Sequence, residues 1–287
     1  MFSKIGLITN SGVRAVGQTL NELLGYFSNK NLDIVLDRCS ADLIDTNGYE
    51  VVAKAELGKH CDLAIAIGGD GTMLMAAHLL CEDEVPLLGI NMGHVGFLSD
   101  IPADAIKTNL DLVLAGNYVE DVRFLLRGQV FRNEKCIAED YALNDIIIQK
   151  WNIAKLVELD TFIDGAFVHT HRSDGLIIAT PTGSTAYALS GGGPVVHPSL
   201  DALILVPICP HSLTNRPIVV NGDSYIEIVV GTRKIDQARL TFDGNVVQEL
   251  APIDRIKINK KNKKIRLIHP SGHDQFHILR EKLHWSK

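Results

Sequence analysis

Residues 68 to 72, GGDGT, place one carboxylate among three glycines. Glycines let a backbone come close to a phosphate chain, and a helix that begins here would offer free amide groups and partial positive charge. An acid does not help to bind phosphate. We therefore predict that Asp70 accepts a proton from the group that receives a phosphate. The alternative is a tight strand-to-helix turn in which Asp70 caps the helix.

The common nucleotide-binding motifs are missing from this sequence. Gly58-Lys59 is followed by His60, which breaks GxxxxGK[ST], and the glycine-rich loops near residues 70 and 95 do not complete GxGxxG. Any phosphate chemistry must therefore use another arrangement.

A second polar and glycine-rich stretch covers residues 172 to 194, RSDGLIIATPTGSTAYALSGGGP. It offers several hydroxyl groups at the end of an apolar run, and Tyr187 is suited to stack on a base or to close a pocket. Such a density of small polar residues beside buried strands predicts a ligand site. The alternative is a long surface loop.

The apolar run 142 to 148, ALNDIII, is interrupted by Asn144 and Asp145. An adjacent amide and carboxylate suit the vicinal hydroxyls of a ribose, because one donates and the other accepts. The same pair is also common in turns and bulges, so both interpretations stay open.

Two further groups have simpler interpretations. His169 and His171 would share one face of a strand, which is metal-site spacing, but no acid or cysteine is obviously placed to complete the set, so a metal site there is disfavoured. The lysines at 260, 261, 263 and 264 are most simply explained as a solvated hairpin tip.

The elements that must position these residues alternate over the first hundred positions. Apolar runs predict strands at 4–9, 32–37, 62–67 and 86–90, and helical spacing predicts helices at 14–28, 48–57, 72–80 and 102–115. This alternation predicts an α/β domain with a Rossmann-like open parallel sheet over residues 1–117. Ligands bind such sheets at the carboxyl ends of the strands, which is where GGDGT lies.

From about residue 118 the pattern changes to short β-rich runs with few helical patterns. Three dipeptides favour tight hairpin turns: Asp164-Gly165, Asn221-Gly222 and Asp243-Gly244. We predict a mostly antiparallel β domain over residues 118–268. Residues 273–285 predict a C-terminal helix with Phe276, Leu279 and Leu283 on one face, which packs back on the first domain, so that 269–287 belong to that domain.

Composition narrows the class of protein. The net charge of -6 and the pI near 6.0 argue against a nucleic-acid partner, which would demand a basic face. Five scattered cysteines without a CxxC motif predict reduced thiols, with neither a disulfide framework nor a zinc site. The first residues, MFSKIGLITNSG, have too short an apolar run for the pattern expected of a secretory signal, and no apolar run approaches the ~20 residues that span a bilayer. We expect a soluble cytoplasmic protein that does not bind a membrane.

Taken together, these stretches resemble the NAD kinase family of the bacterial type over most of the chain. The resemblance rests on GGDGT at 68–72, NMGHVGFL at 91–98, Asn144-Asp145, SDGLIIATPTGSTAYALSGGGPVVHP at 173–198 and ICPHSLTNRPIV at 208–219. They follow the family's order and spacing. Diacylglycerol kinases, sphingosine kinases and phosphofructokinases use strings similar to GGDGT, whereas TPTGSTAY followed by PHSLTNRP is far more specific.

The resemblance implies transfer of the terminal phosphate of ATP, or of polyphosphate in some members, to the 2′-hydroxyl of the adenosine ribose of NAD. It implies a divalent metal, usually Mg²⁺, for which it supplies no protein ligand. It also implies a cytoplasmic homo-oligomer, either a dimer or a tetramer, with NAD between the two domains.

The family's functional residues carry over position by position. Asp70 matches the catalytic acid and Gly71 its neighbour at the ligand. Asn144 and Asp145 match an Asn-Glu pair, and the shorter acid changes the reach of that contact. The remaining matches are Arg172 and Asp174 on either side of a turn, Thr185, Ala186, Tyr187, Ala188, Leu189 and Ser190 at the adenosine half, and Lys155 and Asn245 at further ligand positions, where the family often has Gln in place of Asn245.

The chemistry agrees with this assignment. Phosphoryl transfer passes through a loose transition state, and catalysis is mainly positioning and charge stabilisation. A carboxylate with an ordinary pKa of ~4 cannot deprotonate an alcohol beforehand, but it can accept the proton as the O–P bond forms. Cations then stabilise the phosphates. Two other functions remain open: a lipid kinase of the diacylglycerol type, and a non-catalytic NAD(H)-binding regulator.

Overall fold

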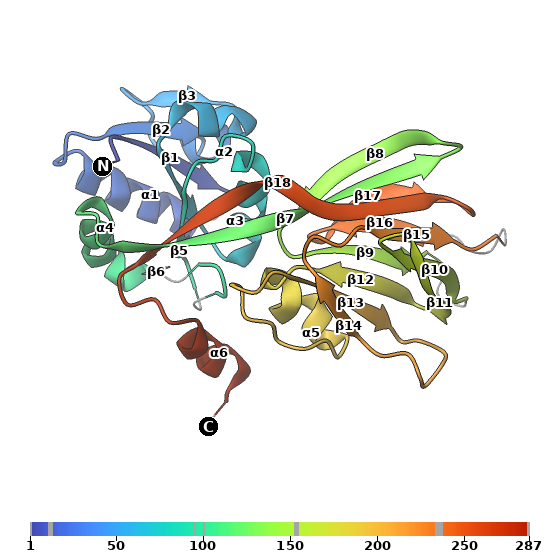
Figure 1. Ribbon diagram of the computed structural model, residues 1–287. Helices are drawn as coiled ribbons and strands as arrows, with labels where there is room; N and C mark the ends of the chain where they lie inside the picture. Colours follow the sequence, from blue (N-terminus) through green and yellow to red (C-terminus); the bar gives the residue numbers. More distant parts are fainter. Residues whose placement is uncertain are drawn as a thin grey trace. The chain divides into compact units, whose positions relative to one another are not determined.

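The computed structural model describes residues 2–10, 14–93, 96–99, 101–151, 155–232 and 238–285. The internal contacts divide the chain into an N-terminal unit, Met1–Val122 with Lys263–Lys287, and a β unit, Arg123–Asn262. Two long strands, β7 (Tyr118–Arg132) and β18 (Arg255–Pro270), each continue from one unit into the other (Figure 1).

The N-terminal unit contains the predicted open parallel sheet. Its strands lie in the order β5-β4-β1-β2-β3, and the end of β18 adds a parallel strand beside β5. Their bounds are β1 (Lys4–Thr9), β2 (Asp33–Asp37), β3 (Glu50–Val52), β4 (Leu63–Ile67) and β5 (Leu87–Asn91), with a short β6 (Ile101–Pro102) beside β5. Strands β4 and β5 are buried along their whole length, as their continuous apolar sequences require.

Helices of this unit follow the strands in the chain. They are α1 (Arg14–Phe27), α2 (Arg38–Ala41), α3 (Asp70–Leu80), α4 (Ile106–Leu114) and α6 (Gln275–Leu283), with 3-10 helices at Lys54–His60 and Ala103–Ala105. Leu20, Leu23 and Phe27 of α1 are buried at the predicted helical spacing. No helix in the part of the chain that the structure describes is long and apolar enough to cross a membrane.

Two predicted helices differ from the structure. The predicted helix 48–57 is wrong in its first part, because residues 50–52 form β3, which pairs with β2. Two adjacent β-branched valines favour that pairing over a helix. The predicted helix 102–115 begins only at Ile106, after β6 and a 3-10 turn.

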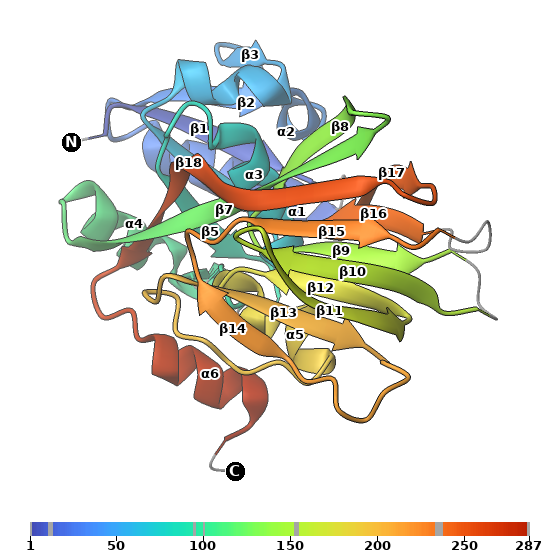
Figure 2. The ribbon, with the colours of Figure 1, turned by 45° about the vertical axis from the view of Figure 1, so that its right-hand side comes forward.

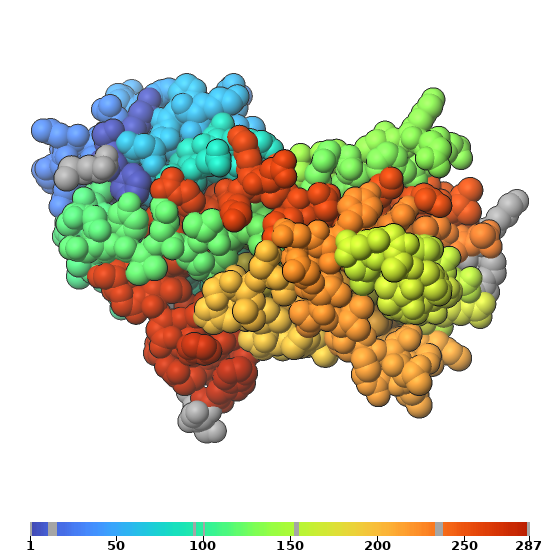
Figure 3. Space-filling view, viewed as in Figure 1, coloured from blue at the N-terminus to red at the C-terminus, as the bar shows by residue number. Residues whose placement is uncertain are grey.

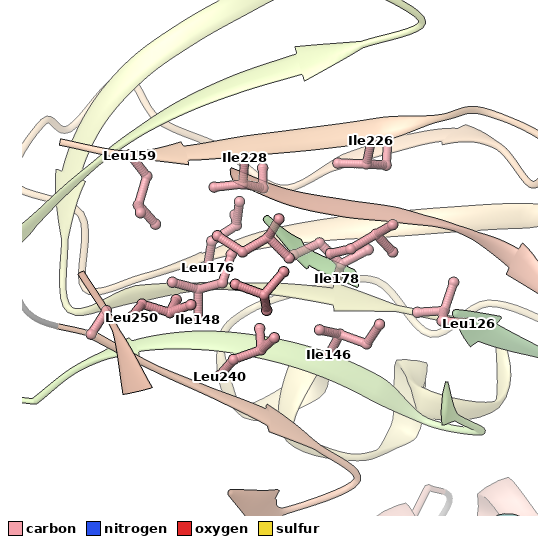
Figure 4. Packing of buried hydrophobic residues seen from close by; sticks show 14 of the residues in the cluster. Leu126, Ile146, Ile148, Leu159, Leu176, Ile178, Ile226, Ile228, Leu240 and Leu250 are labelled. Atoms are coloured by element: carbon pink, nitrogen blue, oxygen red, sulfur yellow. The ribbon is translucent and has the colours of Figure 1, made fainter. Parts of the chain in front are cut away.

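The β unit contains two antiparallel sets of strands packed face to face. One sheet has the order β14-β13-β12-β9-β16-β17, and the other set runs β11-β10-β15-β18. Leu176, Ile148 and Leu240 of the first sheet meet Leu159 and Ile228 of the second in one buried cluster (Figure 4). This arrangement confirms the predicted antiparallel β architecture. The bounds not yet given are β8 (Lys135–Ala142), β9 (Asp145–Lys150), β10 (Val157–Ile163), β11 (Ala166–Ser173), β12 (Gly175–Ala179), β13 (Ala202–Ile208), β14 (Ile218–Asn221), β15 (Ile226–Val230), β16 (Ala238–Phe242) and β17 (Asn245–Leu250).

Strands β12 and β13 are buried on both faces, which explains their continuous apolar sequences. One face of β12 and β13 packs in the buried cluster between the two sets of strands of the β unit. On the other face Ile177, Ile204 and Val206 pack around Ala188 of the short helix α5 (Tyr187–Ser190), which lies beside these strands in both ribbon views (Figures 1 and 2).

The predicted turns have different outcomes. Asp164-Gly165 joins β10 to β11 and Asp243-Gly244 joins β16 to β17, each with both residues at positive φ, as a tight hairpin requires. Asn221-Gly222 is not a hairpin turn, because β14 pairs with β13 and β15 pairs with β10 and β18.

The prediction that the four lysines at 260, 261, 263 and 264 form a hairpin tip is also wrong, because all four lie within β18. Lys260 forms ion pairs with Asp201 (2.5 Å) and Asp223 (2.7 Å). The Lys261 ammonium lies 3.5 Å from the centre of the Tyr141 ring. Partners on neighbouring elements thus take up charges of Lys260 and Lys261 that sequence alone assigned to solvent.

Candidate functional site

Asp70 is the first residue of α3 and lies in the N-terminal unit. Its side chain does not cap that helix, so the cap interpretation is wrong. The carboxylate instead accepts hydrogen bonds from the loop after β5: Phe97 N to Oδ2 at 2.8 Å, Leu98 N to Oδ1 at 3.0 Å and Ser99 N to Oδ1 at 3.3 Å. The two glycine-containing loops that the sequence singled out are therefore joined through this one carboxylate.

Glycine has two different roles around Asp70. A Cβ atom on Gly96 would lie 1.9 Å from Asp70 Oδ1, and one on Gly68 would lie 2.2 Å from Thr72 Oγ1, so these two positions exclude side chains. Gly69 and Gly71 are exposed, and a Cβ on either would meet nothing within 4 Å. Their backbone faces open space at the start of a helix, where amide groups lack intrahelical partners and favour an anion. His94 and Val95 of the second loop lie outside the described residues.

A second group of candidate residues lies in the β unit, where β9 begins. The amides of Leu143, Asn144 and Asp145 all donate to the carboxylate of Asp243, at 2.7, 2.8 and 3.0 Å. Asp243 itself sits in the turn between β16 and β17. From sequence, Asp243 is predicted only as a turn residue, since nothing in the sequence signals a contact with amides about a hundred positions away.

Asp145 is a buried acid, with 4% of its surface exposed. Burial, with a smaller contribution from the Asp243 carboxylate, raises the pKa of Asp145 to about 7. Near neutral pH this side chain is therefore present in both protonation states and can donate to or accept from a hydroxyl group. The half-buried Asn144 next to it has an amide that does both at once.

The TPTGST turn packs directly against this group. Thr180 N donates to Asn144 O at 2.9 Å, and Thr180 Oγ1 donates to Leu143 O at 2.6 Å. A Cβ on Gly183 would lie 2.1 Å from Asn144 O, so only glycine allows this approach. Arg123, which is 4% exposed, donates from Nη1 to Thr182 Oγ1 at 2.8 Å. The structure thus brings together two stretches that the sequence analysis proposed separately.

The segment predicted to line the adenosine half begins in this turn. A 3-10 helix, Thr182–Thr185, leads into α5. Thr185 and Ala186 are half-buried, Tyr187 and Ser190 are exposed, and Leu189 is half-buried. Ala188 is fully buried against the strands, so its methyl group belongs to the core.

The remaining predicted residues have definite partners or positions. Lys150 Nζ lies 2.6 Å from Asp174 Oδ1, whereas Arg172 Nε donates to Glu158 Oε2 at 2.8 Å. Lys150 was not predicted, because a lysine at a strand end carries no signal of its own. Two of the predicted residues are exposed: Lys155, and Asn245, which opens β17 beside the Asp243 turn.

His169 and His171 lie on one face of β11 with ring centres 4.8 Å apart. Burial, reinforced by the neighbouring ring, lowers the pKa of His171 to about 4, so this imidazole is neutral at pH 7. No third metal-ligating side chain joins the pair within the described ranges. His171 is buried and His169 is half-buried.

Comparison with known proteins adds independent findings. A family model described as the ATP-NAD kinase N-terminal domain matches residues 5–118, and one described as the ATP-NAD kinase C-terminal domain matches residues 143–270. The NAD kinases of Marinobacter nauticus and Chromohalobacter salexigens are each 44% identical over 285 residues, covering 99% of this chain and 97% of theirs.

Solved structures agree with these matches. Yeast NADH kinase complexed with NADH superposes with a TM-score of 0.90 at 25% identity, covering 99% of this chain and 88% of that chain. An NAD kinase from Archaeoglobus fulgidus in complex with ATP has a TM-score of 0.74 at 24% identity over 98% of both chains, which is a likeness of fold.

Proposed function

The chain belongs to the NAD kinase family, and on that premise we propose that it transfers the γ-phosphate of ATP to the 2′-hydroxyl of the adenosine ribose of NAD, giving NADP and ADP. The observation that carries the chemistry is the environment of Asp70. This carboxylate stands at the first residue of a helix, between exposed glycine backbones, and three loop amides hold it.

We assign Asp70 the role of proton acceptor. Because backbone amides fix both of its oxygens, the carboxylate needs no reorganisation when substrate arrives. A carboxylate has about four lone-pair sites, and Oδ2 accepts a bond from Phe97, which leaves a direction for the ribose hydroxyl. The proton moves to this oxygen as the O–P bond forms, while the helix amides favour the negative phosphates.

We propose that the β-unit group holds NAD. Asn144 and Asp145 offer donors and acceptors for ribose hydroxyls, and Thr185, Tyr187 and Ser190 are placed at accessible positions beside them. Asp174 and Asn245 supply further polar contacts. The half-exposed Arg172 and the exposed Lys155 supply positive charge for the phosphates. The Lys150–Asp174 ion pair supports this assignment, because it orients the Asp174 carboxylate.

We propose that a divalent cation, Mg²⁺, enters with ATP. Mg²⁺ in nucleotide enzymes is held by one or two carboxylates together with substrate phosphates and water. In the described part of the chain the single group of three metal-ligating side chains contains two imidazoles, which suit Mg²⁺ poorly. The phosphates and water would therefore supply most ligands of the cation. Bound there, the metal would neutralise charge on the transferred phosphoryl group.

We also propose that the protein is a cytoplasmic homo-oligomer. Strand β11 is the last strand of its sheet, with β10 on one side, and it presents Phe167 and Val168 with 58% and 41% of their surfaces exposed. Figure 3 shows this β10–β11 hairpin, in yellow-green, on the surface of the β unit. An open strand edge with apolar side chains is a template for pairing with another chain. The free thiols at Cys39, Cys136 and Cys209 support a reducing compartment.

One assay tests the proposed function against its two alternatives. Purified protein is incubated with Mg²⁺, ATP and either NAD or NADH, and the 2′-phosphorylated dinucleotide is quantified. We expect NADP or NADPH to form. NAD binding without any product under varied metals and donors would support the regulator, and phosphorylation of diacylglycerol in its place would support the lipid kinase. Replacing ATP by polyphosphate in the same assay identifies the donor.

A further inference from the structure

Three metal-ligating side chains converge in the N-terminal unit, apart from Asp70. They are Asp121 on β7, His269 near the end of β18 and His273 in the turn that leads to α6, and one ligand atom of each lies within 4.8 Å of the others. His269 Nε2 is 3.7 Å from Asp121 Oδ2. The His269 and His273 rings are stacked, with their centres 3.8 Å apart and an interplanar angle of 22°.

The local sequence explains why the two histidines meet. Pro270 ends β18, and Gly272 takes a φ of +101°, which a side chain would strain. His273 N donates to Pro270 O at 3.2 Å and closes the turn, so the fourth residue after His269 returns to its ring. Strand β7 pairs with β18 and supplies the carboxylate. The two strands and the turn thus fix the backbones of all three residues.

The donor set selects a class of metal. Two imidazole nitrogens and one carboxylate oxygen suit Zn²⁺ and neighbouring divalent transition metals, whereas Mg²⁺ and Ca²⁺ prefer oxygen ligands alone. Bonds of ~2.0–2.1 Å at tetrahedral angles put ligand atoms roughly 3.4 Å apart. An imidazole nitrogen binds a metal in the plane of its ring, so the partly exposed His273 ring must turn out of its stack on His269 when the ion binds. The Asp121 carboxylate moves closer, while the His269 ring, 2% exposed, keeps its place.

We propose that Asp121, His269 and His273 form a binding site for a divalent transition metal of the zinc class, with water as the fourth ligand. The bound ion would tie the segment before α6 to β7 and β18. Its role would be structural, because none of the three residues belongs to the group proposed for phosphoryl transfer. The scattered cysteines predict no zinc site, whereas the His-x₃-His spacing at 269 and 273 supplies a different set of donors.

The test uses the full chain, stripped of metal with a chelator and then titrated with Co²⁺ and, separately, Zn²⁺. We expect one Co²⁺ per chain with the visible absorption of a nitrogen- and oxygen-ligated tetrahedral ion, and a higher Tm with Zn²⁺. The affinity should fall at least ~10-fold in His273→Ala and in Asp121→Asn, because even outer-shell changes cost about 10–100-fold. The matched control is His277→Ala, an exposed histidine on α6, which should bind as the parent does.

Two results would overturn the proposal. One is metal binding that is equal in parent, His273→Ala and Asp121→Asn proteins, or absent from all three. The other is a thiolate-to-cobalt charge-transfer band, which would place the ion on a cysteine. His273 is a partly exposed turn residue, so its variant should fold; the far-ultraviolet spectrum and Tm of the metal-free proteins check this. The readout does not depend on NAD kinase activity, so failure of the proposed function leaves this test intact.

Discussion

At the scale of single residues, the hydrogen bonds of Asp70 mean that replacing this residue has two effects. Asparagine keeps the shape of aspartate but replaces one acceptor oxygen with an amide donor. In Asp70→Asn that donor would face either Phe97 N–H or the amides of Leu98 and Ser99. The substitution therefore removes a proton acceptor and leaves a loop amide without its partner, so rate and stability must both be measured.

We expect Asp70→Asn to lower kcat by ~10²–10⁴-fold, which is the usual loss when a general base is removed. We expect it also to cost about 1–3 kcal/mol of unfolding free energy for the unpaired amide, with NAD affinity largely kept. Steady-state kinetics and urea unfolding separate the two effects. Asp104→Asn, the same change at an exposed position, is the control. Turnover within a few-fold of the parent would show that Asp70 only positions the loop.

Asp145 predicts a dependence of stability on pH. Its pKa is about 7 in the folded chain and ~3.9 when unfolded, so between these values the folded state binds more protons. The unfolding free energy therefore falls as pH rises from about 4 to about 7, by an amount of the order of 4 kcal/mol. Asp145→Asn removes this contribution. The unfolding free energy of the variant minus that of the parent should therefore be larger at pH 8 than at pH 5. Equal differences at the two pH values would contradict the assignment.

At the scale of elements, the Asp243 turn is the main support of the candidate dinucleotide site. Asp243→Ala leaves three backbone amides of residues 143–145 without their acceptor. At about 1–3 kcal/mol for each buried unsatisfied group, we expect a marked loss of stability and weaker NAD binding. Calorimetric NAD titration and denaturant unfolding measure both.

The chain offers a matched control for this prediction. Asp164 occupies the equivalent position in the β10–β11 turn, also at positive φ, and accepts bonds from Tyr225 N and Ser224 Oγ. Asp164→Ala should cost stability in the same way but leave NAD affinity unchanged. If both variants lost NAD affinity equally, the effect would come from general destabilisation and not from the loop at residues 143–145.

The sequence predicted strands and helices correctly where the signal lay in neighbouring residues. It failed where a contact joins residues far apart in the chain. The parallel strands 62–67 and 86–90 and the helix α1 follow from runs and spacing that tertiary packing reinforces. The prediction that the Lys260–Lys264 run is a solvated hairpin tip failed because the ion-pair partners of Lys260, Asp201 and Asp223, lie far away in the sequence. The Asp243 contact was missed for the same reason, and the Asp70 cap interpretation failed because Phe97–Ser99 compete for its carboxylate. The candidate acid Asp70 could be singled out because its glycine-flanked loop is contiguous in the sequence.

At the scale of the whole molecule, the open edge of β11 tests the proposed assembly. Phe167→Ser removes the largest exposed apolar side chain of that strand and should shift the protein toward monomer. Light scattering after size exclusion measures this. Val246→Ser changes a comparably exposed residue on β17, the last strand of the other sheet, and should leave the mass unchanged. An assembly that is insensitive to Phe167→Ser would place the interface elsewhere.

The return of β18 to the N-terminal unit bears on how the protein is made. Leu267 pairs beside Leu87, so the sheet that begins at residue 4 gains its last strand only near the end of the chain. Residues 123–262, although synthesised later, are complete before that strand leaves the ribosome. Closing so long a loop is slow, since non-local contacts cost loop entropy before they stabilise anything. We expect ribosome-stalled chains from which residues up to about 262 have left the exit tunnel to carry a protease-resistant β unit behind a protease-sensitive N-terminal segment. The first part translated would be the last to become native.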